Sequence, residues 1–383
     1  MISQPLRPRL RSRRTGPLAA GMTAILAAAV LAAAGLALAG YDPVAAGHAL
    51  VSGAFGSWER FASITLVRAT PLILTGLAVA LAFRAGVWNI GAEGQLYAGA
   101  VAAVWVGLAF PAAPAWLLLP GAMAAAAVAG GLWTLVPVGL RFRAGVGEVI
   151  TTILMNFVAI HTVAWLVHGP LQEARGVFPQ TDPIALAARL PRLGSGRLHA
   201  GFPVAVVLAG ALWWLLRNSA WGFRVRAVGA SVRAAAVSGR IHTGRVVLGA
   251  FLFSGMLAGL AGGVEVAGVT FALYENLSPG YGYTAIAVAL LAGLNPIAVL
   301  LAAGFFGVLQ AGAAAMQRDV GVPAVWVSAI EALVILAVVA ADRFLRRGME
   351  TGAGPPGRSA ASPGSEARES SSGSGDPLSD TGG

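Results

Sequence analysis

The chain has 383 residues, of which 57% are hydrophobic and only 11% are charged, whereas a soluble domain carries roughly 25% charged residues. This composition indicates an integral membrane protein, and the absence of cysteine excludes disulfides, thiol nucleophiles and thiolate metal sites. The net charge of +10 rests on arginine alone, because the sequence holds no lysine. The arginines are spread between hydrophobic runs, which is typical of membrane topology signals. This distribution predicts no nucleic-acid partner.

The N-terminus is basic over residues 1–16 and leads into an apolar run at 17–40. A cleaved signal peptide is one interpretation, and Arg13-Arg14 could belong to a twin-arginine signal. The run is longer than a signal core of roughly 7–15 residues and long enough to span a bilayer. We therefore predict a retained first helix, followed by a short external loop from Tyr41 to Glu59.

Further apolar segments of about bilayer length follow along the chain. They lie near 61–82, 87–109, 115–139, 148–168, 201–217, 246–270, 283–294, 296–316 and 323–341. The sequence thus predicts an all-α polytopic membrane protein with about ten transmembrane helices, in a range of about eight to ten because the short pair at Asn295-Pro296 could be one broken helix.

An even number of crossings places both termini on the same side of the membrane. The arginine-rich N-terminus, the loop at 218–245 and the tail then all lie in the cytoplasm, as the positive-inside rule requires. The membrane domain covers 17–342, and its external loop at 169–200 could be a docking surface or a connector. Residues 343–383 have almost no large apolar side chains, so we predict a disordered cytoplasmic tail.

A polar stretch at 83–95 lies between two of these apolar segments and holds three glycines together with Asn89, Glu93 and Gln95. Ionisable groups at membrane depth are costly and mark solute paths, and glycines there let a helix break beside a cavity. Asn89 and Glu93 would share a face if the backbone is helical. We predict that the stretch lines a solute path; the alternative is a solvated turn after Arg84.

A second polar stretch opens the segment at 148–168, where Glu148, Thr152 and Asn156 recur every four residues. On a helix they form one stripe, which should face the protein interior because it would be costly toward lipid. The stripe could contact solute, bond neighbouring helices, or do both.

Three glycines, Gly255, Gly259 and Gly263, also recur at every fourth residue. This spacing allows two membrane helices to approach closely, so we predict a packing role. Arg68 and Glu331 lie within spans and need partners, which could be each other.

The loop at 218–245 contains a short alanine-rich helix, with Ser231 as a good N-cap and Gly239 as a good stop. A capped helix flanked by arginines suits a docking element for a soluble subunit, although an ordinary connector is the alternative. A Walker A loop requires a lysine, and the sequence has none. The five histidines form no His-x-x-x-His pair. We therefore predict no catalytic, metal-binding or cofactor-binding residues, and an outside ATPase if ATP drives transport.

The stretch from Phe83 to Gln95 resembles the signature of permease subunits of nucleoside-type ABC importers, and residues 147–156 resemble a second signature of that family. Residues 251–265 are similar to one of its helices. The family's cytoplasmic coupling segment corresponds to Arg226, Gly229, Ser231, Ala234, Ala235 and Gly239. Ser231-Val232 stands where the family commonly has Asn-Pro, and Arg240 where an apolar residue is usual.

This resemblance implies a transmembrane permease subunit in a bacterial plasma membrane. It implies cytoplasmic ATPase subunits that use ATP, a second permease subunit, often a related but different chain, and an external substrate-binding lipoprotein. Motion of the coupling helix would switch the permease between outward-facing and inward-facing states, and the cargo would be nucleosides. Two alternatives remain: an ABC permease for a simple sugar such as ribose, and a proton-coupled secondary transporter or intramembrane enzyme using Glu93, Glu148 or Glu331.

Overall fold

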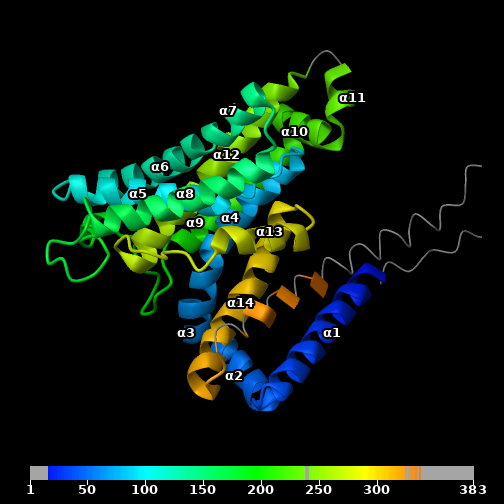
Figure 1. The fold of residues 1–383 in the computed structure, drawn as a ribbon, viewed down its shortest axis with the longest axis vertical. Coiled ribbons are helices and arrows are strands. Elements are labelled where there is room, and N and C mark those ends of the chain that lie inside the picture. The colour runs from blue at the N-terminus through cyan, green and yellow to red at the C-terminus, as the bar shows by residue number, and fades with distance from the viewer. Residues whose placement is uncertain are drawn as a thin grey trace, which may run out of the picture.

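The computed structural model describes residues 16–237 and 241–323, with side chains from residue 26, and short helical pieces between residues 326 and 337. Every regular element in these residues is helical (Figure 1). The elements are α1 (Gly16–Leu38), α2 (Pro43–Phe55), α3 (Trp58–Arg60), η1 (Phe61–Leu66), α4 (Val67–Arg84), α5 (Ala92–Ala109), α6 (Ala115–Trp133), α7 (Leu135–Ala144), α8 (Glu148–His168), η2 (Leu186–Ala188), α9 (Gly201–Asn218), α10 (Ala220–Ala230), α11 (Val232–Val237), α12 (Thr243–Glu265), η3 (Val266–Thr270), α13 (Tyr281–Leu291) and α14 (Pro296–Val320).

Six stretches of the described helices are long and apolar enough to cross a membrane, which confirms the predicted class of multi-pass helical membrane protein. They are Trp58–Arg84, Ala115–Ala144, Glu148–His168, Gly201–Asn218, Thr243–Thr270 and Pro296–Val320. The segment expected at 323–341 lies largely outside the described residues, and the first 15 residues and the tail at 343–383 lie wholly outside them.

The predicted external loop from Tyr41 to Glu59 is wrong, because most of it forms α2. The Asp42 side chain accepts a hydrogen bond from the Val44 N–H at 2.8 Å, and Pro43 occupies the first helical position. Both are strong helix-start signals. At 13 residues α2 is shorter than the roughly 20 residues that span a bilayer. A search of the sequence for runs of bilayer length therefore does not detect it.

Helix α12 lies at the centre of the packing and contacts α4, α5 and α6. The three glycines at every fourth residue face α6: a Cβ at Gly259 would collide with the Ala126 carbonyl, and one at Gly255 with Thr134. On α5, a Cβ at Gly99 would collide with the backbone of Gly259. Small residues therefore let three helix backbones approach each other directly.

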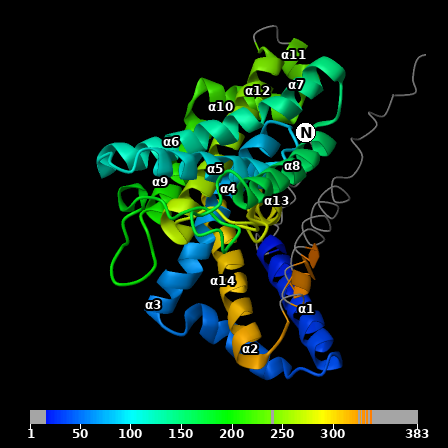
Figure 2. The same cartoon turned by 60° about the vertical axis from the view of Figure 1, so that its left-hand side comes forward.

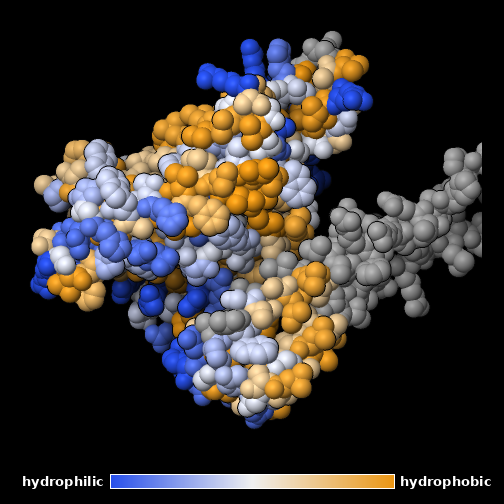
Figure 3. Space-filling model, in the orientation of Figure 1, coloured by the Kyte–Doolittle hydropathy of each residue, from blue (hydrophilic) through white to orange (hydrophobic). Residues whose placement is uncertain are grey.

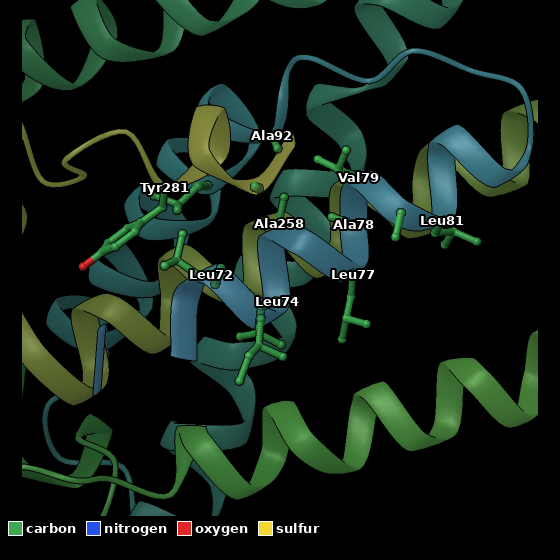
Figure 4. Close-up of a cluster of buried hydrophobic side chains, with 14 of the residues drawn as sticks. Leu72, Leu74, Leu77, Ala78, Val79, Leu81, Ala92, Ala258 and Tyr281 are labelled. Atoms are coloured by element: carbon green, nitrogen blue, oxygen red, sulfur yellow. The ribbon is translucent and has the colours of Figure 1, made fainter. Parts of the chain in front are cut away.

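The apolar core continues from α12 onto α4 and the start of α13. Figure 4 shows Leu72, Leu77 and Leu81 along α4, with Ala258 of α12 and Tyr281 of α13 beside them. These α4 leucines are fully buried. Because α4 is enclosed by other helices, its C-terminal end has a fixed position, and so does the start of the loop that leads to α5.

At the other end of the molecule, α2 joins α1 to α14, and α1 stands apart from the main body in Figure 1, whereas in the turned view of Figure 2 it projects close to α14. Leu36, Ala46 and Met316 form a small buried cluster where these helices meet. Apolar side chains spread over much of the outer surface (Figure 3), as a lipid-facing surface requires. Examples are Trp116, Trp165, Val207 and Leu301.

Candidate functional site

The predicted helix at 87–109 begins only at Ala92, so the polar stretch straddles a non-helical loop and a helix start. After α4 ends at Arg84, Gly86 turns the chain with a φ of 75°, a conformation that glycine adopts without strain. Asn89 lies in the loop, and Glu93 lies in the first turn of α5. They therefore do not share a helix face, and each side chain has its own partners.

Asn89 is fully buried and pairs with Gln95 through two hydrogen bonds. The Asn89 Nδ2 donates to Gln95 Oε1 and the Gln95 Nε2 donates to Asn89 Oδ1, both at 3.0 Å. Asn89 Nδ2 also donates to Ser254 Oγ at 2.8 Å, and Ser254 donates to the Ala78 carbonyl at 2.7 Å. These bonds tie the loop to α12 and α4, and they satisfy amides that would be costly to bury alone.

Asn156 holds the same helix start from the side of α8. Its Oδ1 accepts from the Gly94 N–H at 2.8 Å, and its Nδ2 donates to the Ile90 carbonyl at 2.9 Å. Thr152 is buried one turn earlier, and a Cβ at Gly91 would lie 3.1 Å from it. The structure thus brings the two polar stretches together, although they are far apart in the sequence.

Glu148 does not join this network. It lies near the end of α7, and its Oε1 is 2.8 Å from Arg141 NH1 in an ion pair. The predicted stripe is therefore divided: Thr152 and Asn156 face the start of α5, whereas Glu148 faces α7. Glu148 stays partly exposed, and an ion pair there contributes modestly to stability.

Glu93 connects α5 to the start of α13. Its carboxylate is 1% exposed, and Oε2 accepts from the Gly282 N–H at 2.6 Å. A Cβ at Gly282 would collide with the backbone of Glu93, and Ala92 and Tyr281 lie close together in Figure 4. A carboxylate at a helix N-terminus satisfies free N–H groups and complements the helix dipole.

The predicted docking helix is present as α11. Ser231 Oγ accepts from the Ala234 N–H at 3.2 Å, which is the geometry of an N-cap. Ala235 is buried, whereas Ser231, Ala234 and Val237 are exposed on the upper end of the molecule in Figure 1. Gly239 lies outside the described residues.

Gly229, which precedes α11, lies against the loop that carries Asn89. A Cβ at Gly229 would collide with the Arg84 carbonyl and would lie 3.3 Å from the Gly86 N–H. Arg226 is a charged neighbour of Arg84. The segment before α11 is therefore in direct backbone contact with the loop that leads to the buried polar network.

Arg68, within α4, has a charged neighbour that sequence analysis did not identify. Glu331 lies outside the described residues, and the charged neighbour of Arg68 is Glu265. Arg68 and Glu265 both lie within apolar runs. A charged residue inside such a run is the signal that could have singled them out. Their positions in α4 and α12 gave no indication that they meet.

The fold and this buried polar network define a multi-pass membrane protein of the transporter type. Residues 61–339 match the model of the permease component of branched-chain amino acid transport systems, and the chain belongs to this family. It is 40% identical to a glucose ABC transporter permease of Haloferax volcanii, with 87% of this chain and 91% of the relative covered. It is 37% identical to a guanosine ABC transporter permease of Bacillus subtilis, with 87% and 97% covered.

A nucleoside ABC transporter permease of Lactococcus lactis is 32% identical, with 77% of this chain and 83% of the relative covered. The resemblance to nucleoside-type ABC permeases is therefore confirmed, with sugar permeases also related. No solved structure matches the chain.

Proposed function

We propose that this chain is a transmembrane subunit of an ATP-driven importer and forms the path along which nucleosides cross a bacterial plasma membrane by alternating access. A second permease chain, cytoplasmic ATPase subunits and an external substrate-binding lipoprotein complete the complex. Both termini, α11 and the loop at 218–245 lie on the cytoplasmic side, since the arginines concentrate there.

The observation that carries the proposal is the contact between Gly229 and Arg84. Gly229 lies in the last turn of α10, directly before α11, and Arg84 ends α4, directly before the loop with Asn89. A displacement of α11 by an ATPase would reach the loop through the end of α10, whose backbone touches that of Arg84. Packed interfaces of this kind shift between discrete arrangements instead of deforming continuously.

Two features support a nucleoside as the cargo: the motif from Asn89 to Gln95, and the relatives named for guanosine and nucleosides. A second candidate is a free sugar, because the 40% identical relative is named as a glucose permease. In both cases ATP hydrolysis belongs to a partner, since a standard Walker A motif requires the lysine that this chain lacks.

The test is reconstitution of the complete importer in proteoliposomes, with uptake of labelled guanosine measured in competition with unlabelled guanosine, ribose and glucose. The proposal predicts ATP-dependent uptake that nucleosides compete and free sugars do not. If ribose or glucose competes with uptake and nucleosides do not, the transported solute is a sugar. Uptake by this chain alone, driven by a proton gradient, would contradict the importer.

A further inference from the structure

A polar cavity of about 410 Å³ lies beside α4, η3 and α14, away from the network around Asn89. Its volume is within the range of roughly 300–1,000 Å³ found for small-molecule sites. Eight residues with polar side chains line it. They are Ser63, Arg68, Arg197, Glu265, Tyr274, Asn276, Tyr281 and Arg318.

Glu265 is the most unusual of these groups. It is 5% exposed, and it makes no hydrogen bond and no ion pair within 4 Å to the residues that the structure describes. Arg68 and Arg197 are its charged neighbours. A buried carboxylate without hydrogen-bond donors is costly. Its oxygens line the cavity, where donors from a bound molecule would satisfy them.

The backbone around this cavity departs from regular structure on two sides. The π-helical turn η1 contributes Ser63 and Ile64, and the π-helical turn η3 contributes Val269. Such turns are rare and occur frequently at functional sites. The loop between η3 and α13 also holds Phe271 and Asn276 at φ values of 59° and 60°. Residues other than glycine rarely adopt this conformation, and it clusters at ligand sites.

Two adjacent residues, Tyr281 and Gly282, connect the cavity to Glu93. Tyr281 lines the cavity, and the next N–H, that of Gly282, donates to Glu93. A molecule that displaces Tyr281 would therefore act on the contact between α13 and α5.

We propose that this cavity is a solute-binding site of the permease and takes an uncharged, hydroxyl-rich ring. Glu265 accepts hydrogen bonds from neighbouring hydroxyls, Arg68 donates to a ring or hydroxyl oxygen, and the rings of Tyr274 and Tyr281 pack against the solute. The inner end holds one negative and one positive side chain, while Arg197 and Arg318 lie at its more exposed edge. An anionic solute would face the Glu265 carboxylate.

This inference rests on the proposed function, and both the sugar of a nucleoside and a free hexose carry the required chemistry. The test uses the complete importer in proteoliposomes with Glu265→Gln and, as a matched control, Glu275→Gln. Glu275 lies in the loop between η3 and α13, and its side chain is 43% exposed and is 3.9 Å from His168. Solute uptake and ATP hydrolysis stimulated by the loaded binding protein are measured together.

Glu265→Gln should raise the KM of uptake by about tenfold or more, the loss expected when a charged hydrogen-bond acceptor becomes neutral. Stimulated ATP hydrolysis should stay near the wild-type rate, and Glu275→Gln should match the wild type in both. A wild-type KM in Glu265→Gln would overturn the solute site while leaving the importer intact. Failure of the wild type itself to import any solute with ATP would instead contradict the proposed function.

A second pair of variants tests the shape of the cavity. Ala314→Leu places a larger side chain at its wall, and Ala298→Leu makes the same change near the start of α14, outside the cavity. The first should reduce guanosine uptake, and the second should leave guanosine uptake at the wild-type level. Wild-type guanosine uptake in Ala314→Leu, or stronger competition by guanosine monophosphate than by guanosine, would overturn the inference.

Discussion

The Glu93 carboxylate accepts the Gly282 N–H at 2.6 Å and thereby joins the starts of α5 and α13. The two residues are 189 positions apart in the sequence. The bond connects the cavity beside Glu265 with the loop that contacts Gly229. It is therefore the point at which solute and coupling segment would influence each other.

Replacing Glu93 tests whether it acts as an acceptor or as a proton carrier. Glu93→Ala leaves the buried Gly282 N–H of α13 without its acceptor, which costs about 1–3 kcal/mol. Glu93→Gln keeps an acceptor oxygen. We expect Glu93→Ala to lower the melting temperature and uptake while assembly survives, and Glu93→Gln to retain most of both. Equal loss of transport in the two variants, with normal stability of Glu93→Gln, would favour proton transfer.

The amide pair of Asn89 and Gln95 should be coupled to Ser254. Asn89→Ala removes both the pair and the bond to Ser254 Oγ, so we expect lower uptake and a loss of stability of about 1–3 kcal/mol. In a double-mutant cycle with Ser254→Ala, a coupling energy of about 0.5–3 kcal/mol is expected for residues in one network. Thermal unfolding of the four proteins measures it, and additive effects would show that the bond is unimportant.

Gly229→Ala should uncouple ATP hydrolysis from uptake. Its Cβ would collide with the Arg84 carbonyl, so the end of α10, which leads into α11, and the loop could no longer approach as they do now. Gly210→Ala in α9 is the matched control, because nothing lies within 4 Å of a Cβ there. We expect stimulated hydrolysis with reduced uptake in the first variant and wild-type behaviour in the control. Normal coupling in Gly229→Ala would refute the role of this contact.

The cap at Ser231 should have a smaller effect of the same kind. Ser231→Ala removes the acceptor for the Ala234 N–H, a change that typically costs about 0.5–2 kcal/mol of helix stability. Uptake per ATP hydrolysed is the measurement, and an intermediate ratio between the wild type and Gly229→Ala is expected. An unchanged ratio would show that α11 does not require its cap in the complex.

His199 gives the loop before α9 a defined pH dependence. Burial, and then the nearby Arg197, lowers the pKa of His199 to about 4, and its Nδ1 accepts from the Gly201 N–H. The unfolded chain takes up this proton near its ordinary pKa of about 6.5. The contribution of His199 is therefore complete above about pH 6.5 and is lost as the pH falls toward 4. His199→Gln should flatten this part of the stability curve, and His48→Gln, exposed on α2, should not.

The sequence predicted the helical membrane class, because long apolar runs leave a direct signature, and it singled out the polar stretch at 83–95, where Asn89, Glu93 and Gln95 are buried. It placed the start of α5 five residues too early, since apolar content alone does not show that Val87 to Gly91 are non-helical. Asn89 and Glu93 were expected on one face only for a helical backbone, and Asn89 lies in the loop before α5. The proximity of Arg68 and Glu265 depends on tertiary packing, which no spacing in the sequence encodes.

The most direct test of this account is ATP-dependent uptake of labelled guanosine by proteoliposomes that hold the complete importer with either wild-type or Gly229→Ala permease. The account predicts accumulation that requires ATP and the ATPase subunits in the wild type, and its loss in Gly229→Ala while hydrolysis continues. Guanosine uptake that needs no ATP, or that is unchanged in Gly229→Ala, would contradict it.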